Sequence, residues 1–265
     1  MGAIAEQPRV QQTAFTQGIP WAAIGWFLGL LILAYAPVLA RLLNQWNDDE
    51  DMGHGFFVPV LAGYIIWTQR DQLLKIKPEP TWFGLVVVAW GAAQLIVATL
   101  GAELFLARTA FLISLVGCIL YLGGMPFIRA LAFPLLLLVF MVPIPAIIYN
   151  QITFPLQLLA SSIAEKTLNF VGIPVFREGN VLETPTQRLS VVEACSGIRS
   201  LLSLSFLSLV YAYFFDRRVW MRWALLILVV PIAIIANAGR VTLTGLLGEI
   251  DPQLSEGFYH PAQGG

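Results

Sequence analysis

The chain contains little charge, and this separates it from ordinary soluble proteins. Lysine, arginine, aspartate and glutamate make up 12% of the 265 residues, whereas 58% of the residues are hydrophobic. Soluble domains carry about 25% charged residues, so the composition predicts an integral membrane protein. The formal net charge is −1, which gives no reason to expect nucleic acid or another polyanion as a partner.

Cysteine and histidine are also scarce, with two residues of each. Two cysteines do not make a disulfide framework or a cysteine-rich metal site, so we expect neither a metal nor a cofactor. Cys118 lies in a wholly apolar run, where a thiol packs as a small hydrophobic group. Cys195 instead follows polar residues at the expected start of a helix. The helix dipole and nearby cations favour the reactive thiolate in such a position.

Long hydrophobic runs predict membrane-spanning helices. A bilayer core about 30 Å thick needs about 20 apolar residues per helix, and about eight segments reach or approach this length. They are Trp21–Leu43, Phe56–Trp67, Trp82–Leu100, Leu104–Leu122, Ile128–Tyr149, Ser196–Phe215, Val219–Ala236 and Arg240–Ile250. We expect a kink or break in the fifth segment, which contains Pro134, Pro143 and Pro145. The chain is thus predicted to be an all-α polytopic membrane protein, with residues 1–265 as a single domain.

The charges between these segments predict the topology. The cationic connections fall on one face of the expected bundle, which the positive-inside rule makes cytoplasmic. They contain Arg70, Lys75, Lys77, Arg129, Arg217 and Arg218. The acidic run Asp48–Asp51 and residues 150–194 lie on the opposite face. Cys195 therefore opens onto the outer face.

Residues 150–194 form an outer-face insertion with two parts. Apolar residues at roughly helical spacing predict an amphipathic helix on the membrane surface. They are Ile152, Leu156, Leu159, Ile163 and Leu168. The segment Val175–Leu182 contains a Gly-Asn turn and predicts a short β-hairpin, to which Arg188–Val192 could add a third strand.

Candidate reactive groups gather around Cys195. Arg199 is four residues further on, so it shares a helix face with the cysteine, and Glu193 precedes them. Two interpretations stay open: Cys195 is a nucleophile, or it packs as an ordinary membrane cysteine.

A second group lies at Asn237, Arg240 and Thr244, whose spacing puts them on one face of a helix. An arginine beside an apolar tract is costly to bury, so it indicates either a bound carboxylate, carbonyl or phosphate, or a side chain that extends to the lipid headgroups. His54 and His260 lie at glycine-rich membrane boundaries, and we expect both on the outer face, unless they are only solvent-exposed. A cysteine, an arginine and a histidine on one face suffice for thiol acyl transfer.

At this point the motifs resemble those of a known family. The runs Glu193–Leu201, Ala236–Val241 and Glu256–His260 resemble the three signature regions of the exosortases, bacterial relatives of the archaeosortases. The sequence His54-Gly55-Phe56 resembles a further family feature, and the resemblance extends from about Met52 to His260. It implies a membrane-embedded cysteine transpeptidase in the bacterial cytoplasmic (inner) membrane, with its active site facing the periplasm.

The resemblance also implies residue roles and partners. Cys195 is the nucleophile and acyl carrier, Arg240 is the proton donor or carbonyl-orienting cation, and His260 matches a third catalytic position. Orienting or substrate-binding roles fall to Asn237, Glu193, Arg199 and His54. The substrates are exported proteins with a C-terminal Pro-Glu-Pro-type motif, a transmembrane helix and a basic tail. Family members usually continue into a further helix after the histidine, so we expect that helix to be truncated or absent here.

A non-enzymatic scaffold or transporter component for polysaccharide export is the alternative. A transporter is expected to have intramembrane polar pathways or paired repeat halves, and the sequence indicates only the outer-face cluster.

Overall fold

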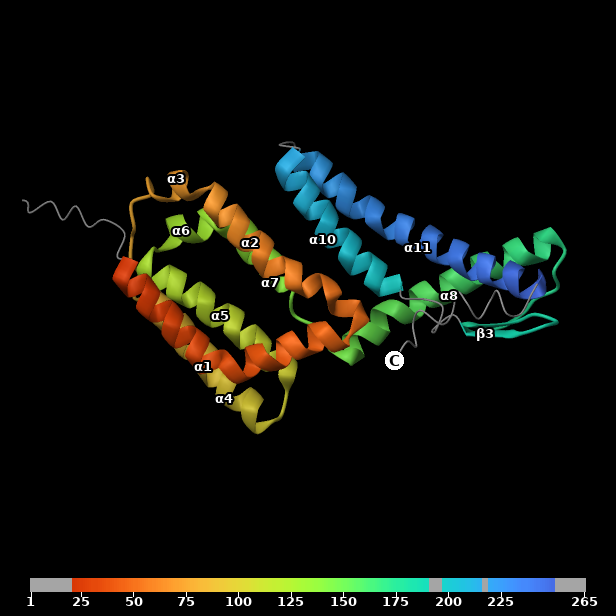
Figure 1. Cartoon of the computed structure of the whole chain (residues 1–265), viewed down its shortest axis with the longest axis horizontal. Helices are drawn as coiled ribbons and strands as arrows, with labels where there is room; N and C mark the ends of the chain where they lie inside the picture. The colour runs from red at the N-terminus through yellow and green to blue at the C-terminus, as the bar shows by residue number, and fades with distance from the viewer. Residues whose placement is uncertain (1–20, 191–196, 216–218, 251–265) are drawn as a thin grey trace, which may run out of the picture.

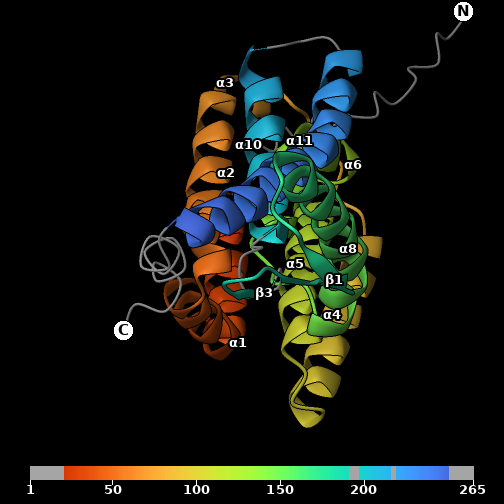
Figure 2. The same ribbon diagram turned by 90° about the vertical axis from the view of Figure 1, so that its right-hand side faces the viewer.

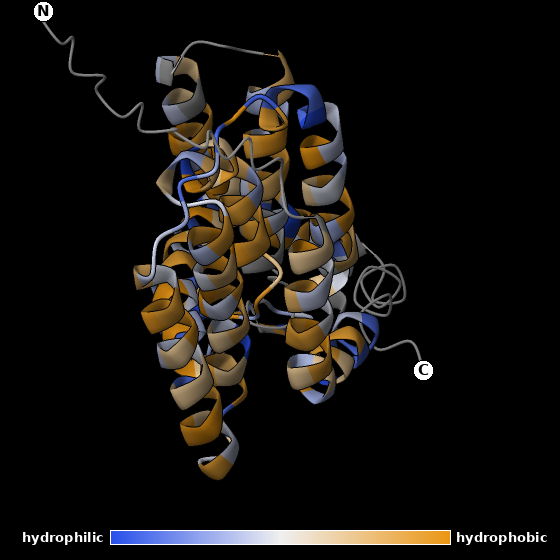
Figure 3. Cartoon of the chain, turned by 90° about the vertical axis from the view of Figure 1, so that its left-hand side faces the viewer, coloured by the Kyte–Doolittle hydropathy of each residue, from blue (hydrophilic) through white to orange (hydrophobic). Residues whose placement is uncertain are grey.

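Apolar helices make up most of the molecule (Figure 1). The computed structural model describes residues 21–190, 197–215 and 219–250. The first half contains α1 (Trp21–Asp48), η1 (Glu50–Phe56), α2 (Phe57–Thr68), α3 (Arg70–Leu73), α4 (Phe83–Leu100) and α5 (Leu104–Leu122). The second half contains α6 (Met125–Ala130), α7 (Ala132–Val139), α8 (Ala146–Val171), α10 (Gly197–Phe215) and α11 (Val219–Ile250). Hydrophobic residues cover most of the helical surface seen in Figure 3, as expected of helices that contact lipid.

The expected number of about eight spans is not confirmed. Among the described residues, four helices are long and apolar enough to cross a membrane. They are Ala22–Asp48, Phe83–Leu100, Leu104–Leu122 and Trp223–Glu249. The shorter apolar helices Met52–Thr68 and Leu202–Phe215 accompany them.

Two of the expected segments are a single helix. Val219–Ala236 and Arg240–Ile250 were separated because Asn237 and Gly239 are poor helix formers, but α11 runs through them without a break. A glycine inside a helix costs only about 1 kcal/mol, which packing easily offsets. Ala238 and Val241 are buried, and Val241 belongs to a core cluster with residues of α8 and the sheet. Tertiary packing therefore decides the length of α11.

The segment Ile128–Tyr149 is broken, as its prolines predict. α6 and α7 are short and are separated at Leu131. Pro134 is tolerated because it lies in the first turn of α7, where its missing N–H is not needed. Residues 140–145, which include Pro143 and Pro145, separate α7 from α8. α8 thus begins at Ala146, before the expected start of the insertion at residue 150.

Glycines let α4 and α5 pack closely. A Cβ atom at Gly84 would lie 2.3 Å from the backbone nitrogen of Tyr121, and one at Gly91 would lie 2.2 Å from the hydroxyl of Ser114. Small residues allow helix backbones to approach in membranes, where packing and hydrogen bonds drive association. The Tyr35 hydroxyl of α1 adds such a bond, 2.7 Å from the Ser114 Oγ atom. The three helices α1, α4 and α5 therefore form one packed unit.

The largest core cluster joins this unit to the remaining helices. Leu42, Trp46, Val58, Ile65, Leu137, Met141 and Phe206 belong to it, and they come from α1, α2, α7, α10 and the segment after α7. The indole nitrogen of Trp46 donates a 3.0 Å hydrogen bond to the Met141 carbonyl oxygen. This bond satisfies a carbonyl in the irregular segment between α7 and α8, which a membrane would otherwise leave without a partner.

The predicted strands are confirmed as a small antiparallel sheet. β1 (Phe176–Glu178), β2 (Val181–Glu183) and β3 (Arg188–Ser190) lie in that order, with Gly179 at a positive φ of 64° in the first turn. Residues 191 and 192 of the expected third strand lie outside the described residues. Leu182 and Leu189 pack with Ala164 of α8 and Val241 of α11. Figure 2 shows α8, α11 and the sheet together on one side of the molecule.

α8 is the expected amphipathic helix, but its buried face is not the one marked by its large apolar residues. Ile152, Leu159 and Ile163 are exposed. Small and polar residues are buried instead: Thr153, Ala160, Ser161 and Ala164, together with Leu168. Small residues suit a close crossing with α11, and they leave the large apolar side chains free to contact lipid.

The cationic connections lie at one end of the bundle, as the sequence predicts. α3 and α6 lie at this end in both views, and Arg70 and Phe127 line one cavity there. The Gln69 side chain donates to the Tyr213 hydroxyl, so α2 and α10 end side by side. Arg217 and Arg218 lie outside the described residues. The compartment that each end faces stays a prediction.

Candidate functional site

Asn237 and Arg240 lie on α11 in a part of the helix that packs against α8. Ala238 and Val241 are 2% and 1% exposed, whereas Arg240 is exposed and Asn237 is half-buried. Thr244 is 3% exposed, and its hydroxyl donates a 3.0 Å hydrogen bond to the Arg240 carbonyl oxygen. The predicted helical face of Asn237, Arg240 and Thr244 therefore exists, with the arginine directed to the surface.

The length of α11 sets the level of this face in the bundle. α10 and α11 pack against each other as consecutive helices. Gly197 lies 18 residues before the end of α10 at Phe215, and Asn237 lies 18 residues after the start of α11 at Val219. Because both helices rise about 1.5 Å per residue, Asn237 is level with the first residue of α10, and Arg240 lies one turn beyond it.

The sheet holds this end of α11 in place. The Gln187 side chain donates to the Thr244 carbonyl oxygen at 3.4 Å, and the Thr186 hydroxyl donates to a carboxylate oxygen of Glu249 at 2.8 Å. Gly248 lies against the Gln187 side chain, where a Cβ atom would clash. Sequence reasoning missed these polar residues because their spacing follows no helix or strand period and their partners are about 60 residues away.

His54 lies on η1, at the junction of three elements. Its Nε2 atom is 3.2 Å from the Phe140 carbonyl oxygen, and its ring centroid is 6.2 Å from that of Phe206 on α10. A carbonyl oxygen only accepts, so Nε2 carries the hydrogen in this contact. His54 is thus oriented by the backbone just after α7 and lies beside α10.

An apolar groove extends from His54 between α2 and α10. Its volume is about 590 Å³. Phe57, Val60, Leu61 and Tyr64 form one wall, and Ser203, Phe206, Leu207 and Val210 form the other. Val60 is 71% exposed and Leu207 is 60% exposed, so the groove is open toward the lipid.

The remaining candidate residues lie outside the described residues or are described only by their backbone. Glu193, Cys195 and His260 lie outside the described ranges. Arg199 lies in the first turn of α10, and only its backbone is described. The other cysteine, Cys118, lies in α5 and is partly buried, in agreement with a packing role.

Arg108 is a buried polar residue that the sequence argument did not select. It lies on α5, is 5% exposed, and its Nη2 atom donates a 2.5 Å hydrogen bond to Oε1 of Gln45 on α1. An arginine within the apolar run Leu104–Leu122 was the available signal, because intramembrane charges are costly. Its contact is between helices, so we assign it to the packing of α1 on α5.

Metal ligands are not clustered in the described part of the chain, where no group of three or more histidine, cysteine, aspartate or glutamate side chains could hold an ion. The expectation that the protein uses neither metal nor cofactor stays a prediction.

These features define a helical integral membrane protein with a polar face at one end and an apolar groove beside it. The family model for transmembrane exosortase (Exosortase_EpsH) matches residues 46–265. The chain therefore belongs to the transmembrane exosortase family, whose members are generally cysteine transpeptidases that process sorting signals. No curated protein and no solved structure matches the chain.

Proposed function

We propose that this protein is a membrane-embedded cysteine peptidase and transpeptidase that uses Cys195 to cleave a C-terminal sorting signal of exported proteins. The supporting observation is the register of α10 and α11. Asn237 is level with Gly197, the first residue of α10, and Cys195 precedes Gly197 by two residues in the sequence. A continuous α11 thus carries Asn237 and Arg240 toward the segment that contains the cysteine. The family assignment supplies the reaction class.

The proposed reaction has two acyl-transfer steps. The Cys195 thiolate attacks the carbonyl carbon of the scissile peptide bond, and a thioester forms as the C–N bond breaks. The leaving amine takes a proton, and Arg240 donates a hydrogen bond to the carbonyl oxygen as negative charge develops on it, or supplies that proton. An acceptor nucleophile then attacks the thioester and releases the Cys195 thiolate. His260 occupies the third catalytic position in this proposal.

Second-tier roles follow from the surroundings of the described residues. Asn237 and Arg240 lie on one helix face, so an amide and a guanidinium can bind the same peptide group. His54 lies at the end of the apolar groove, where it can contact a peptide that leaves the bilayer. Glu193 and Arg199 flank Cys195 and are proposed to orient the substrate.

The groove between α2 and α10 is the surface we propose for the transmembrane helix of the substrate. One of its walls is α10, the helix that directly follows Cys195 in the chain. A substrate helix that packs along this wall is therefore guided toward the cysteine, with its basic tail at the cationic end of the bundle. Large apolar contacts such as Leu207 and Val60 suit a helix in lipid, where packing drives association.

The test is co-expression with a secreted reporter that carries the Pro-Glu-Pro-type motif, the hydrophobic helix and the basic tail. We expect the native chain to shorten the reporter, Cys195→Ala to abolish processing, and Arg240→Gln to reduce it by orders of magnitude. Ser208→Ala on α10 and Lys166→Gln on α8 are matched controls that remove comparable groups elsewhere, and they should process normally. A thioester intermediate should be released from the native chain by hydroxylamine.

Processing that survives Cys195→Ala would refute the cysteine mechanism. Polysaccharide export that depends on the protein but not on Cys195, with no reporter processing, would favour the scaffold or transporter alternative. Orientation is tested with a membrane-impermeant maleimide, which should label Cys195 from outside intact cells. Labelling from the cytoplasmic side alone would reverse the proposed topology.

A further inference from the structure

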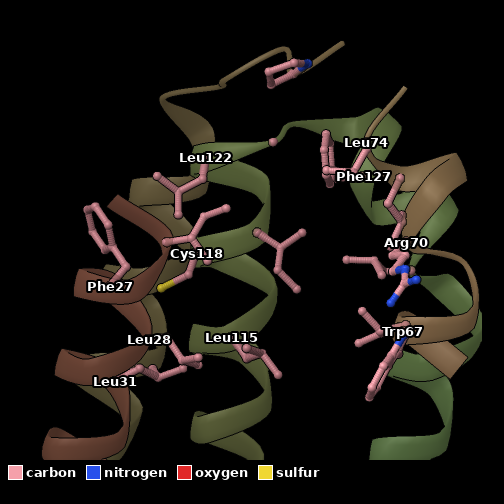
Figure 4. A pocket seen from close by; sticks show the side chains of 17 residues that line it. Phe27, Leu28, Leu31, Trp67, Arg70, Leu74, Leu115, Cys118, Leu122 and Phe127 are labelled. Carbon is pink, nitrogen blue, oxygen red and sulfur yellow. The ribbon is translucent and has the colours of Figure 1, made fainter. Parts of the chain in front are cut away.

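A cavity of about 400 Å³ lies at the cationic end of the bundle, at the opposite end from the proposed catalytic residues. Figure 4 shows its two walls. Phe27, Leu28 and Leu31 of α1 and Leu115, Cys118 and Leu122 of α5 form one wall. The opposite wall is formed by Trp67, Arg70 and Leu74, together with Phe127 of α6. The volume is within the range of about 300–1,000 Å³ that is usual for small-molecule sites.

The chemistry of the walls restricts what can fill this space. Nearly all lining side chains are aliphatic or aromatic, so water would find few of the hydrogen-bond partners that a buried water needs. A soluble polar ligand would leave these walls uncovered for the same reason. An alkyl chain is the ligand that suits them, because its burial is favourable for every methylene group.

One lining residue carries charge. The Arg70 guanidinium lies 5.5 Å from the centroid of the Trp67 ring, and its Nε atom is 3.8 Å from a carboxylate oxygen of Asp71. This distance exceeds that of a hydrogen bond. The side chains of Arg70 and Asp71 are 60% and 81% exposed, so the pair is weak and a competing anion can replace it.

The surroundings of Arg70 add further positive charge. Lys75 and Lys77 follow in the same connection, and both are exposed. Basic residues beside a cavity between membrane helices attract anionic lipid headgroups. The cavity thus combines an apolar interior with a cationic rim, which matches the two parts of an anionic phospholipid.

We propose that this cavity binds one acyl chain of an anionic phospholipid, whose phosphate group pairs with Arg70. The lipid fills the space between the α1–α5 pair and the segment that contains the end of α2 and α3. It thereby joins the unit formed by α1, α4 and α5 to the helices that carry His54 and the groove. This binding site does not depend on the proposed peptidase activity.

Native mass spectrometry of the full chain, purified from nanodiscs with equal amounts of phosphatidylglycerol and phosphatidylcholine, tests the proposal. We expect one retained phosphatidylglycerol per chain. Arg70→Gln should lower the ratio of retained phosphatidylglycerol to phosphatidylcholine by about fivefold, as expected for the loss of one cation near a headgroup. Lys166→Gln removes a cation from α8 and should leave the ratio unchanged.

Filling the cavity separates this site from general lipid contact. Leu115→Trp should abolish retention, whereas Val86→Trp, at a lipid-facing position of α4, should retain the lipid. A phosphatidylglycerol with a diazirine in its acyl chain should crosslink to α1 and α5 residues of the cavity wall in the native chain, which needs no variant to fold. Crosslinks confined to α4, or equal retention of both lipids by the native chain, would overturn the proposal.

Discussion

Replacing Gly239 by alanine distinguishes a continuous α11 from two helices separated by a turn. Gly239 is exposed inside α11, and a Cβ atom built on it meets no other atom within 4 Å. Its backbone is helical, in contrast to the glycines at positive φ, which in the described residues are Gly124, Gly172 and Gly179. Alanine therefore fits without strain and restricts only the unfolded chain.

The expected gain follows from these facts. Alanine is favoured over glycine in a helix by about 0.5–1 kcal/mol, with no steric cost to subtract here. For a chain of this size, 1 kcal/mol corresponds to roughly 2–4 °C in the unfolding midpoint. We expect Gly239→Ala to raise the midpoint by about 1–4 °C.

Gly172→Ala is the matched control. Gly172 ends α8 at a φ of 96°, with its N–H bonded to the Asn169 carbonyl oxygen and no atom near the position of a Cβ. A left-handed alanine costs about 1 kcal/mol or more, so this variant should lower the midpoint by roughly 2–4 °C.

Tryptophan emission during heating in detergent measures both midpoints, and hydrogen exchange of residues 237–244 measures the helix itself. A fall in midpoint for Gly239→Ala, or rapid exchange across these amides, would show that α11 is broken at this point. The proposed level of Arg240 relative to Gly197 would then be withdrawn.

Other predictions concern the packing around the site. Gly84→Leu should lower the unfolding free energy by about 1–3 kcal/mol, whereas Gly25→Leu, at a glycine with open space, should have no effect; equal effects would contradict the close α4–α5 contact. Tyr35→Phe should cost about 1 kcal/mol in the same thermal assay, since its buried hydroxyl bonds to α5, and an unchanged midpoint would argue against that bond. A double-mutant cycle of Glu165→Gln and Arg177→Gln should give a coupling of at most about 1 kcal/mol that falls with salt, because this 2.7 Å pair is partly exposed.

Local features of the chain were predicted from the sequence because they depend on neighbouring residues. The apolar runs Trp82–Leu100 and Leu104–Leu122 match α4 and α5 closely, since a bilayer leaves few alternatives to a helix for such segments. The turn at Gly179 and Asn180 gave the hairpin, because glycine adopts the positive φ that the turn requires. The motifs around Cys195, Arg240 and His260 identified the family that the comparison confirms.

The sequence by itself therefore determined a helical membrane protein, its β-hairpin and its family. Only the tertiary structure decided how these parts are combined. α11 continues through Asn237 and Gly239 because burial of Ala238 and Val241 against neighbouring elements outweighs weak helix propensity. The position of His54 beside Phe140 and the cavity above Leu115 likewise depend on contacts between distant segments, which no local period in the sequence reports.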